Sequence, residues 1–433
     1  MLYYSTNNQS PKISFKQATI NGQAPDKGLY FPEHIPQLDK KLIENIDQYS
    51  NEEIAYNVIK DYVGDAIPKN ELERIIAETI NFDFPLVKIV ENIFSLELFH
   101  GPTLAFKDVG ARFMSRCLGY FVKKDSKQIT VLVATSGDTG GAVADGFYNV
   151  DGVEVVILYP AGKVSSVQEL QLTTHGKNIT AIEVDGSFDD CQKLVKQAFA
   201  DESVSKHLFL TSANSINVAR WLPQQFYYFF AYRQWSDKNN PPVISVPSGN
   251  FGNICAGLLA HRSGLPVAHF IAACNANDAV HQYLATENFT AKSPVSTMSN
   301  AMDVGNPSNF VRILELFDKE FKSLKNVLSS YSISDNETRN AIKKVFHTHN
   351  YLLDPHGAVG YLSLKKYLEQ YPQLNGIFLE TAHPVKFYDV VEPVIQSTVP
   401  MPEAVKNLLN KKKLSIKMGC GYKTFKEYLL SGI

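Results

Sequence analysis

The chain has 433 residues, enough for two or three domains with sizeable cores. Its 42 Lys and Arg nearly balance its 44 Asp and Glu, so the charge gives no basis for binding nucleic acid. The five cysteines form no CxxC pair, which argues against a zinc site and a disulfide framework. No signal core opens the chain and no stretch is apolar over a membrane span, so we expect a cytoplasmic protein without a membrane partner.

The first hundred residues have a mixed pattern and are predicted to form a separate N-terminal domain, residues 1–98. An extended opening leads to the turn-rich run QAPDKGLYFP, and helical patterns follow at 51–63 and 70–79. Two glutamates directly after Asn51 are typical of a helix start, because acids are favoured in the first turn.

The stretch 96–117, LELFHGPTLAFKDVGARFMSRC, places Lys107 among apolar residues at helical spacing. Thr103 or Pro102 can open this helix, which puts Lys107 near its buried start. A buried lysine is costly unless its amine is neutral or covalently engaged, and a Schiff base supplies that engagement. The alternative is a lysine whose stem passes apolar neighbours to reach water, and this stretch alone leaves both interpretations open.

From residue 129 onward, short β-rich apolar runs alternate with helical patterns such as 189–200 and 218–234. Such runs are typical of strands buried on both faces of a parallel sheet, which predicts an α/β architecture with one or two open sheets. The predicted strands are 129–135, 153–160, 178–184, 208–212, 242–248, 268–273 and 376–381. The stretch 288–309 is the most loop-like interior segment, and we expect it to be mobile or to face a substrate.

Two predicted strand-to-helix turns are rich in glycine and small hydroxyl residues. The first, 134–142, reads ATSGDTGGA, and the second, 247–252, reads PSGNFG and is followed by Asn253. Ligands gather at the carboxyl ends of parallel strands, where glycines expose backbone N–H groups beside a helix start. A single such turn is commonly structural, but two in one chain favour the binding of phosphate or carboxylate. Neither turn has the Walker or the GxGxxG pattern.

Two further segments carry polar groups near strand ends. Segment 211–221, TSANSINVARW, offers short donors and an arginine fork that suits an anion, although these residues can equally cap the following helix. Segment 378–384, FLETAHP, ends a strand with Thr381 and His383 on the ligand side, and we favour a hydrogen-bonded interior role for His383 over a catalytic one. The histidines at 347, 349 and 356 lack the HExxH spacing, so no metal site is expected.

Taken together, one candidate imine lysine, two anion-binding turns and a hydroxyl at a strand end suit an enzyme that uses pyridoxal 5'-phosphate. The lysine would bond to the cofactor aldehyde, one turn would hold its phosphate, and another would bind the substrate carboxylate.

The motifs HGPTLAFKD, ATSGDTGGA, SGNFG and ETAHPVKF, together with SFKQA, GLYFP and DDCQKLVKQAF, resemble the threonine synthase family in its shorter microbial and fungal group. The resemblance implies the tryptophan synthase β-like fold (fold type II), with two open α/β lobes and an added N-terminal domain. It implies a core at 99–400, with a smaller lobe at about 128–210, a larger lobe at 99–127 plus 211–400, and a tail at 401–433. The reaction implied converts O-phospho-L-homoserine and water to L-threonine and phosphate.

The resemblance also assigns residues. It implies that Lys107 bonds to the cofactor aldehyde and then moves protons. The cofactor-binding positions that it implies are Gly249, Asn250, Phe251, Gly252 and Asn253 for the phosphate, Thr381 for the ring nitrogen, and Asp138 beside the ring. The substrate-binding positions that it implies are Thr135, Ser136, Thr139, Lys163, Asn214, Ser215 and Arg220. Relatives across the wider fold often have asparagine where this chain has Asp138.

Three alternatives stay open. A phosphohomoserine phospholyase or a serine or threonine dehydratase of the same fold would release a keto acid instead of threonine. A degenerate homologue would bind a metabolite without turnover, but it would have lost the lysine or the phosphate turn. A nucleotide-binding module would lack the yellow cofactor. The sequence leaves open whether the chain is a monomer or a homo-oligomer.

Overall fold

The computed structural model describes residues 1–125 and 128–431, and the chain divides into two compact units. Unit 1 consists of Met1, Phe31–Phe106 and Trp221–Pro400. Unit 2 consists of Leu2–Tyr30, Lys107–Arg220 and Met401–Ile433. The predicted domain limits at residues 98 and 400 stay a prediction.

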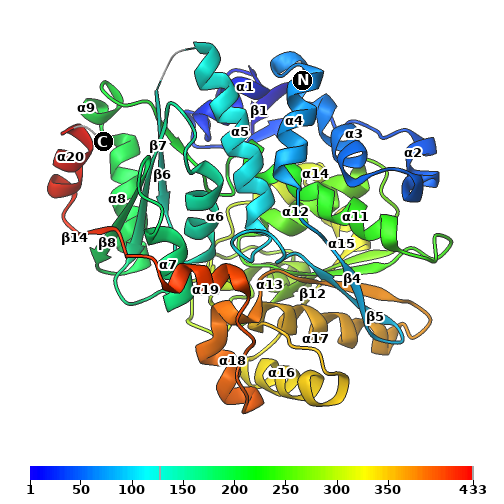
Figure 1. Ribbon diagram of the computed structural model, residues 1–433. Coiled ribbons are helices and arrows are strands. Elements are labelled where there is room, and N and C mark those ends of the chain that lie inside the picture. Colours follow the sequence, from blue (N-terminus) through cyan, green and yellow to red (C-terminus); the bar gives the residue numbers. More distant parts are fainter. Residues whose placement is uncertain (126–127, 432–433) are drawn as a thin grey trace. The chain divides into compact units, whose positions relative to one another are not determined.

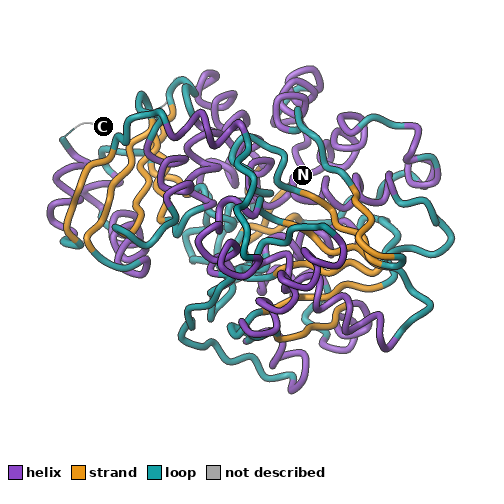
Figure 2. Tube along the Cα trace, turned by 60° about the horizontal axis from the view of Figure 1, so that its bottom comes forward, coloured by secondary structure: helices purple, strands orange, loops and turns teal. Residues whose placement is uncertain are grey.

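Unit 1 is built on a six-stranded sheet in the order β12-β11-β10-β13-β5-β4. All neighbouring strands are parallel except β4, which pairs antiparallel with β5. β10 and β13 are buried along their whole length, as their apolar sequences predict. Figure 2 shows the strands of the sheet side by side in orange. The strands are β4 Leu86–Val90, β5 Ile93–Glu97, β10 Val243–Pro247, β11 His269–Cys274, β12 Leu328–Ser332 and β13 Gly376–Glu380.

Helices cover both faces of this sheet (Figure 1). α17 packs on β13, β10 and β11, and α16 packs against α17, while α12 packs on β10 from the other side. The α-helices of unit 1 are α2 Lys40–Glu44, α3 Asn51–Val63, α4 Lys69–Thr79, α11 Phe226–Gln234, α12 Gly252–Arg262, α13 Ala279–Thr286, α14 Phe310–Leu316, α15 Phe321–Val327, α16 Asp335–His349, α17 Pro355–Gln370 and α18 Tyr388–Ile395. Its 3-10 helices are η1 Ile46–Gln48, η2 Gly64–Ala66, η3 Leu222–Gln225, η4 Asn300–Met302 and η5 Pro384–Phe387.

Unit 2 contains a parallel five-stranded sheet in the order β14-β8-β7-β6-β9. Side chains of β6, β7 and β8 form one core with α8 and α20, and α5 and α6 lie on the opposite face (Figure 1). The edge strand β14 comes from the C-terminal tail, whose role the sequence did not indicate. The strands are β6 Ile129–Ala134, β7 Val153–Pro160, β8 Ile179–Asp185, β9 Leu210–Ser212 and β14 Ser415–Gly419.

The remaining elements include a short antiparallel pair of strands near the N-terminus, β1 and β2. The short strands are β1 Leu2–Ser5, β2 Ile13–Ser14 and β3 Tyr30–Pro32. The helices are α1 Phe15–Asn21, α5 Lys107–Asp125, α6 Asp138–Phe147, α7 Ser166–Thr173, α8 Phe188–Ala200, α9 Glu202–Ser205, α10 Val218–Trp221, α19 Glu403–Leu409 and α20 Tyr422–Leu430. Among the residues that the structure describes, no helix combines the length and apolar composition needed to cross a bilayer.

All seven predicted strands form, but two predicted helices were wrong in detail. The helix that carries Lys107 begins at Lys107 itself and not at Thr103 or Pro102, because Leu104 has a left-handed φ of 57° and the chain is not yet helical there. The predicted helix 218–234 is divided into α10, η3 and α11. Pro223 lies at this break, and a proline has no N–H to continue the helical hydrogen bonds.

Candidate active site

Three adjacent strands of unit 1 end at one edge of its sheet. β5, β13 and β10 are parallel neighbours, with Glu97 opposite Glu380 and Val243 opposite Gly376. The segment that leads to Lys107, the residue Thr381 and the glycine-rich turn after β10 therefore follow this same edge. This is the edge at which parallel sheets bind ligands.

The backbone before Lys107 is tied to the backbone around Thr381. The N–H of Phe106 donates to the carbonyl of Thr381 over 2.9 Å, and the N–H of His383 donates to the carbonyl of Leu104 over 3.0 Å. A β-bridge joins Ala105 to Ala382 between them. Lys107 is the next residue along the chain, so its backbone starts from a point fixed to the strand that carries Thr381.

The turn after β10 combines a left-handed residue with a helix start. Phe251 has φ 60°, and α12 begins at Gly252 with no side chain capping it. The Tyr228 hydroxyl donates to Asn253 Oδ1 over 2.9 Å. Asn253 Nδ2 is buried and has no hydrogen-bond partner among the described residues. A buried donor without a partner is costly, so this turn fits a ligand that brings an acceptor such as a phosphate.

Two titratable side chains flank Thr381 in the chain. Burial, followed by the charge of Asp354, raises the pKa of Glu380 well above its ordinary value. Burial, followed by the charge of His100, lowers the pKa of His383 to about 4. His383 Nδ1 accepts the N–H of Val385 over 3.0 Å, so this histidine is a neutral, hydrogen-bonded interior residue.

In unit 2, the turns after β7, β6 and β9 likewise follow three neighbouring strands. Lys107 begins α5 and Asp138 begins α6. Lys107 Nζ lies 3.4 Å from Asp138 Oδ2, with the lysine side chain 18% exposed and the aspartate side chain 4% exposed. The helix start at Asp138 favours its ionised form, so a carboxylate faces the lysine amine.

Gln168 also binds Asp138, and sequence reasoning missed it. Gln168 Nε2 donates to Asp138 Oδ1 over 2.9 Å, and Gln168 Oε1 accepts the N–H of Ser165 over 3.3 Å. The glutamine thereby fixes the orientation of the carboxylate that faces Lys107. The Ser-x-x-Gln capping box at Ser165 signalled a helix start, but not this contact with α6.

The other predicted residues of the first turn differ in what they bind. Thr135 Oγ1 accepts the N–H groups of Gly137 and Gly140 over 3.1 and 2.8 Å, so this hydroxyl holds the shape of the turn. Ser136 is exposed and Thr139 is partly exposed. These two hydroxyls are therefore better placed than Thr135 to meet a ligand.

The predicted anion-binding residues after β9 are held by the arginine among them. Arg220 is buried, and its guanidinium donates to the carbonyl of Ala213, directly before Asn214 and Ser215, which are partly exposed. Asn217 acts structurally, since its side-chain amide donates to the carbonyl of Thr19 over 2.8 Å. The exposed Lys163 lies in the loop that follows β7. Figure 1 labels β7, the strand that the last of these loops follows.

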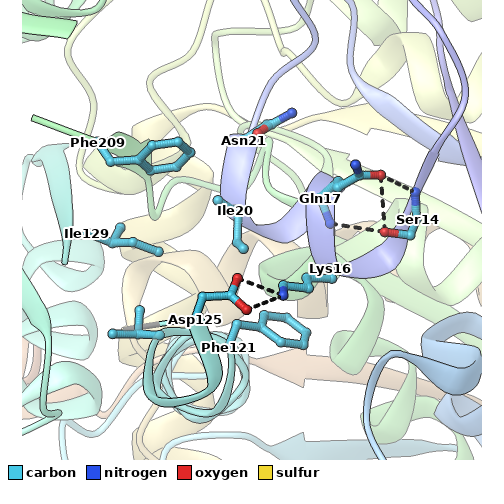
Figure 3. A pocket seen from close by; sticks show the side chains of 10 residues that line it. Ser14, Lys16, Gln17, Ile20, Asn21, Phe121, Asp125, Ile129 and Phe209 are labelled. Carbon is cyan, nitrogen blue, oxygen red and sulfur yellow. Dashed lines mark hydrogen bonds and ion pairs between the residues drawn. The ribbon is translucent and has the colours of Figure 1, made fainter. Parts of the chain in front are cut away.

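A cavity of about 450 Å³ lies elsewhere in unit 2 and contains none of the predicted site residues. Figure 3 shows Ile20, Phe121 and Phe209 along its wall, and an ion pair of 2.7 Å between Lys16 and Asp125. Among residues 1–125 and 128–431, no three His, Cys, Asp or Glu side chains are grouped to hold a metal ion. The five cysteines are free thiols, and only Cys420 is exposed.

Fold and site define a pyridoxal-phosphate-dependent enzyme, and the family model described as "Pyridoxal-phosphate dependent enzyme" matches residues 86–375. The models described as "Threonine synthase N terminus" and "Threonine synthase, C-terminal" match residues 2–80 and 357–428. The chain is 43% identical over 431 residues to a threonine synthase of Haemophilus influenzae, with 99% of this chain and 100% of that one covered.

Solved structures agree with this assignment. The threonine synthase of Escherichia coli is 39% identical, has a TM-score of 0.92 and is covered completely, as is this chain. The PLP-bound threonine synthase of Brucella melitensis is 34% identical, with a TM-score of 0.93 and coverage of 99% of this chain and 98% of that one. The chain belongs to the threonine synthase family, and its cofactor is pyridoxal phosphate.

Proposed function

We propose that the chain converts O-phospho-L-homoserine and water to L-threonine and phosphate, as the last step of threonine biosynthesis in the cytoplasm. The observation that carries this proposal is the lysine amine at the start of α5, 3.4 Å from a buried carboxylate on a glycine-rich turn. The family assignment supports the reaction. The division into an N-terminal domain at 1–98, a core and a C-terminal tail is part of the same proposal.

Pyridoxal phosphate, when bound, supplies an aldehyde that bonds to amines and a ring that withdraws electrons from the attached carbon. We assign its phosphate to the turn formed by Gly249, Asn250, Phe251, Gly252 and Asn253. The buried Nδ2 of Asn253, which has no partner among the described residues, supports this assignment because the cofactor phosphate offers the acceptor that it lacks.

Lys107 is assigned the proton transfers. In its neutral form, Nζ can take the proton from the substrate Cα and return protons at later stages. The Asp138 carboxylate stabilises the charged form of the amine, while Gln168 keeps that carboxylate oriented. The amine can therefore alternate between its two protonation states without rearrangement of its surroundings.

Thr381 is assigned to the ring nitrogen of the cofactor. A hydroxyl there is uncharged, so it leaves the nitrogen largely unprotonated, in contrast to the carboxylate that aminotransferases use. Glu380 does not replace it, because its carboxyl is buried and its Oε1 accepts the N–H of Asp354. This pairing disfavours aminotransferase side reactions.

The substrate anions are assigned to unit 2. Ser136 and Thr139, with Thr135 shaping their turn, are assigned to the α-carboxylate. Asn214, Ser215, Arg220 and Lys163 are assigned to the phosphate, to which they offer neutral donors and positive charge.

One experiment separates this function from its alternatives. The purified chain, loaded with cofactor, is incubated with O-phospho-L-homoserine, and threonine, 2-oxobutyrate and phosphate are measured. We expect threonine and phosphate in equal amounts. A phospholyase would produce 2-oxobutyrate and phosphate, whereas a dehydratase would leave this substrate unchanged and release a keto acid only when serine or threonine is added.

The lysine is tested by Lys107→Ala. We expect loss of the visible imine absorbance and of turnover, because Lys107 is the amine assigned to the cofactor aldehyde. Lys124→Ala, an exposed lysine in the last turn of the same helix, is the matched control and should keep both. A borohydride-reduced sample with its cofactor adduct on another lysine would refute the assignment.

A further inference from the structure

A buried aspartate–histidine pair lies at the start of α17. Its hydrogen bonds go to residues that have no assigned part in the reaction. The His356 side chain is 3% exposed, and its Nδ1 lies 2.5 Å from Asp354 Oδ1. Its Nε2 receives the backbone N–H of Ala301 over 3.2 Å. A backbone N–H can only donate, so Nε2 carries no proton and Nδ1–H donates to Asp354. The contacts therefore fix the hydrogen-bonding role of each ring nitrogen of His356.

Asp354 is itself fixed from two sides. It caps α17 by accepting the N–H of His356 over 2.7 Å and of Gly357 over 3.3 Å. Its own N–H donates to Glu380 Oε1 over 2.6 Å, next to Thr381 at the end of β13. Buried hydrogen bonds thus connect the imidazole through Asp354 to the sheet edge, and they fix the position of the ring.

The other side of His356 supports the glycine-rich turn. A Cβ added to Gly249 would lie 2.7 Å from Met302 Cα and 2.8 Å from the carbonyl oxygen of Ala301, so the backbone of η4 touches the turn directly. Asn250 is held as well, because its Oδ1 accepts the N–H of Ser308. The segment 288–309, expected to be mobile or to face a substrate, is attached to the turn at both of these points.

Two asparagines fix the rest of this segment. Asn275 Nδ2 and Asn277 Nδ2 donate to Asp303 Oδ1 over 2.9 and 3.0 Å. Neither bond reaches Ala301, whose N–H is held by His356. Asn275 Nδ2 also donates to Ser299 Oγ over 3.0 Å, directly before η4, so Asn275 holds the start of η4 while His356 holds the N–H of Ala301 within it.

We propose that His356 is a positioning residue for cofactor binding: through the N–H of Ala301 it holds η4 against Gly249 and so keeps the phosphate turn in its binding shape. This inference rests on the proposed assignment of the turn to the cofactor phosphate. His356 itself contacts Asp354, the ring of Phe387 and the backbone of Ala301, and it acts on the cofactor through η4.

Three substitutions separate the two hydrogen bonds of the ring. His356→Gln can place an amide oxygen near the position of Nε2 and accept from Ala301. His356→Asn is too short for that contact but can still donate to Asp354. His356→Phe fills the space and makes neither bond. His269→Phe is the matched control, since His269 is a part-buried histidine of unit 1 whose Nε2 bonds to Ser329 Oγ over 2.7 Å, away from the turn.

The measurement is the dissociation constant of pyridoxal phosphate, with the phosphorus-31 NMR shift of the bound cofactor. Leaving a buried N–H without its acceptor should weaken binding about 10- to 100-fold in His356→Asn and His356→Phe. His356→Gln should stay within about threefold of the parent, and His269→Phe should bind normally. Turnover at saturating cofactor should match the parent in the control His269→Phe.

A second measurement does not depend on the cofactor. Hydrogen exchange in the cofactor-free chain should be faster at Ala301 and Met302 in His356→Phe and restored in His356→Gln. Equal cofactor affinity in His356→Phe and the parent, or equal losses in His356→Gln and His356→Asn, would overturn the inference alone. A parent chain that carries no cofactor on Lys107 would overturn the proposed function, and the inference with it.

Discussion

Replacing Gly137 by alanine tests how the carboxylate beside Lys107 is held. Gly137 has φ 143° and ψ −99°, a conformation that side chains rarely adopt. An added Cβ would also lie 2.6 Å from three atoms of the Gln168 amide. That amide cannot withdraw without breaking its bonds to Asp138 and to the N–H of Ser165. The substitution therefore meets a backbone cost and a steric cost together.

The magnitude follows from these two costs. Forcing alanine into this backbone conformation costs about 1–3 kcal/mol. Breaking the buried bond from Gln168 to a charged acceptor costs about 1.5–3 kcal/mol more. We therefore expect Gly137→Ala to lower the free energy of unfolding of unit 2 by about 2.5–6 kcal/mol.

The assay is the urea dependence of hydrogen exchange at the amides of α6. The reference is a Gly→Ala substitution at a glycine whose φ is also positive but whose added Cβ would meet no neighbouring atom. Gly264 has φ 110° and nothing within 4 Å of an added Cβ, so Gly264→Ala should lose only the backbone part in its own unit. In a Gln168→Ala background, where the bond from Gln168 to Asp138 is already absent, Gly137→Ala should cost only the backbone part. If Gly137→Ala costs no more than Gly264→Ala, Gln168 does not hold the turn as we describe.

Two electrostatic predictions concern other parts of the chain. A hydrogen bond from Lys366 lowers the pKa of Glu337 to about 2 from 4.5, so its stabilisation is present above pH 4.5 and is lost as the pH falls toward 2. Because its side chain is 42% exposed, we expect only about 1 kcal/mol, measured as the loss of acid dependence in Glu337→Gln. Lys413→Met should raise the pKa of Glu183, which Lys413 lowers, and speed hydrogen exchange in 415–419 about fivefold. Lys413→Arg should keep the protection, and a loss as large as that of Lys413→Met would argue against the ion pair.

Much of the fold follows from patterns within short stretches of the sequence. The seven apolar runs became strands because each is long enough to span a buried sheet, and the helix 51–63 formed as its capping residues indicate. The turns at 134–142 and 247–252 were found because each places glycines and small hydroxyl residues between an apolar strand and a helix start. Lys107 stood out because burying a charged amine among apolar residues is costly, and no residue next to it in the sequence carries an opposite charge except Asp108.

Other contacts were decided only by the tertiary structure. The pairing of residues 104–106 with 381–383 moved the start of the helix to Lys107, although these segments lie far apart in the chain. The choice of Gln168 as the partner of Asp138, and of Ala301 as the partner of His356, has no local signature. Periodicity and capping act between neighbours, so the sequence alone determines them. A buried donor can form a hydrogen bond with any acceptor within reach. Only the packing of the whole chain determines which acceptor that is.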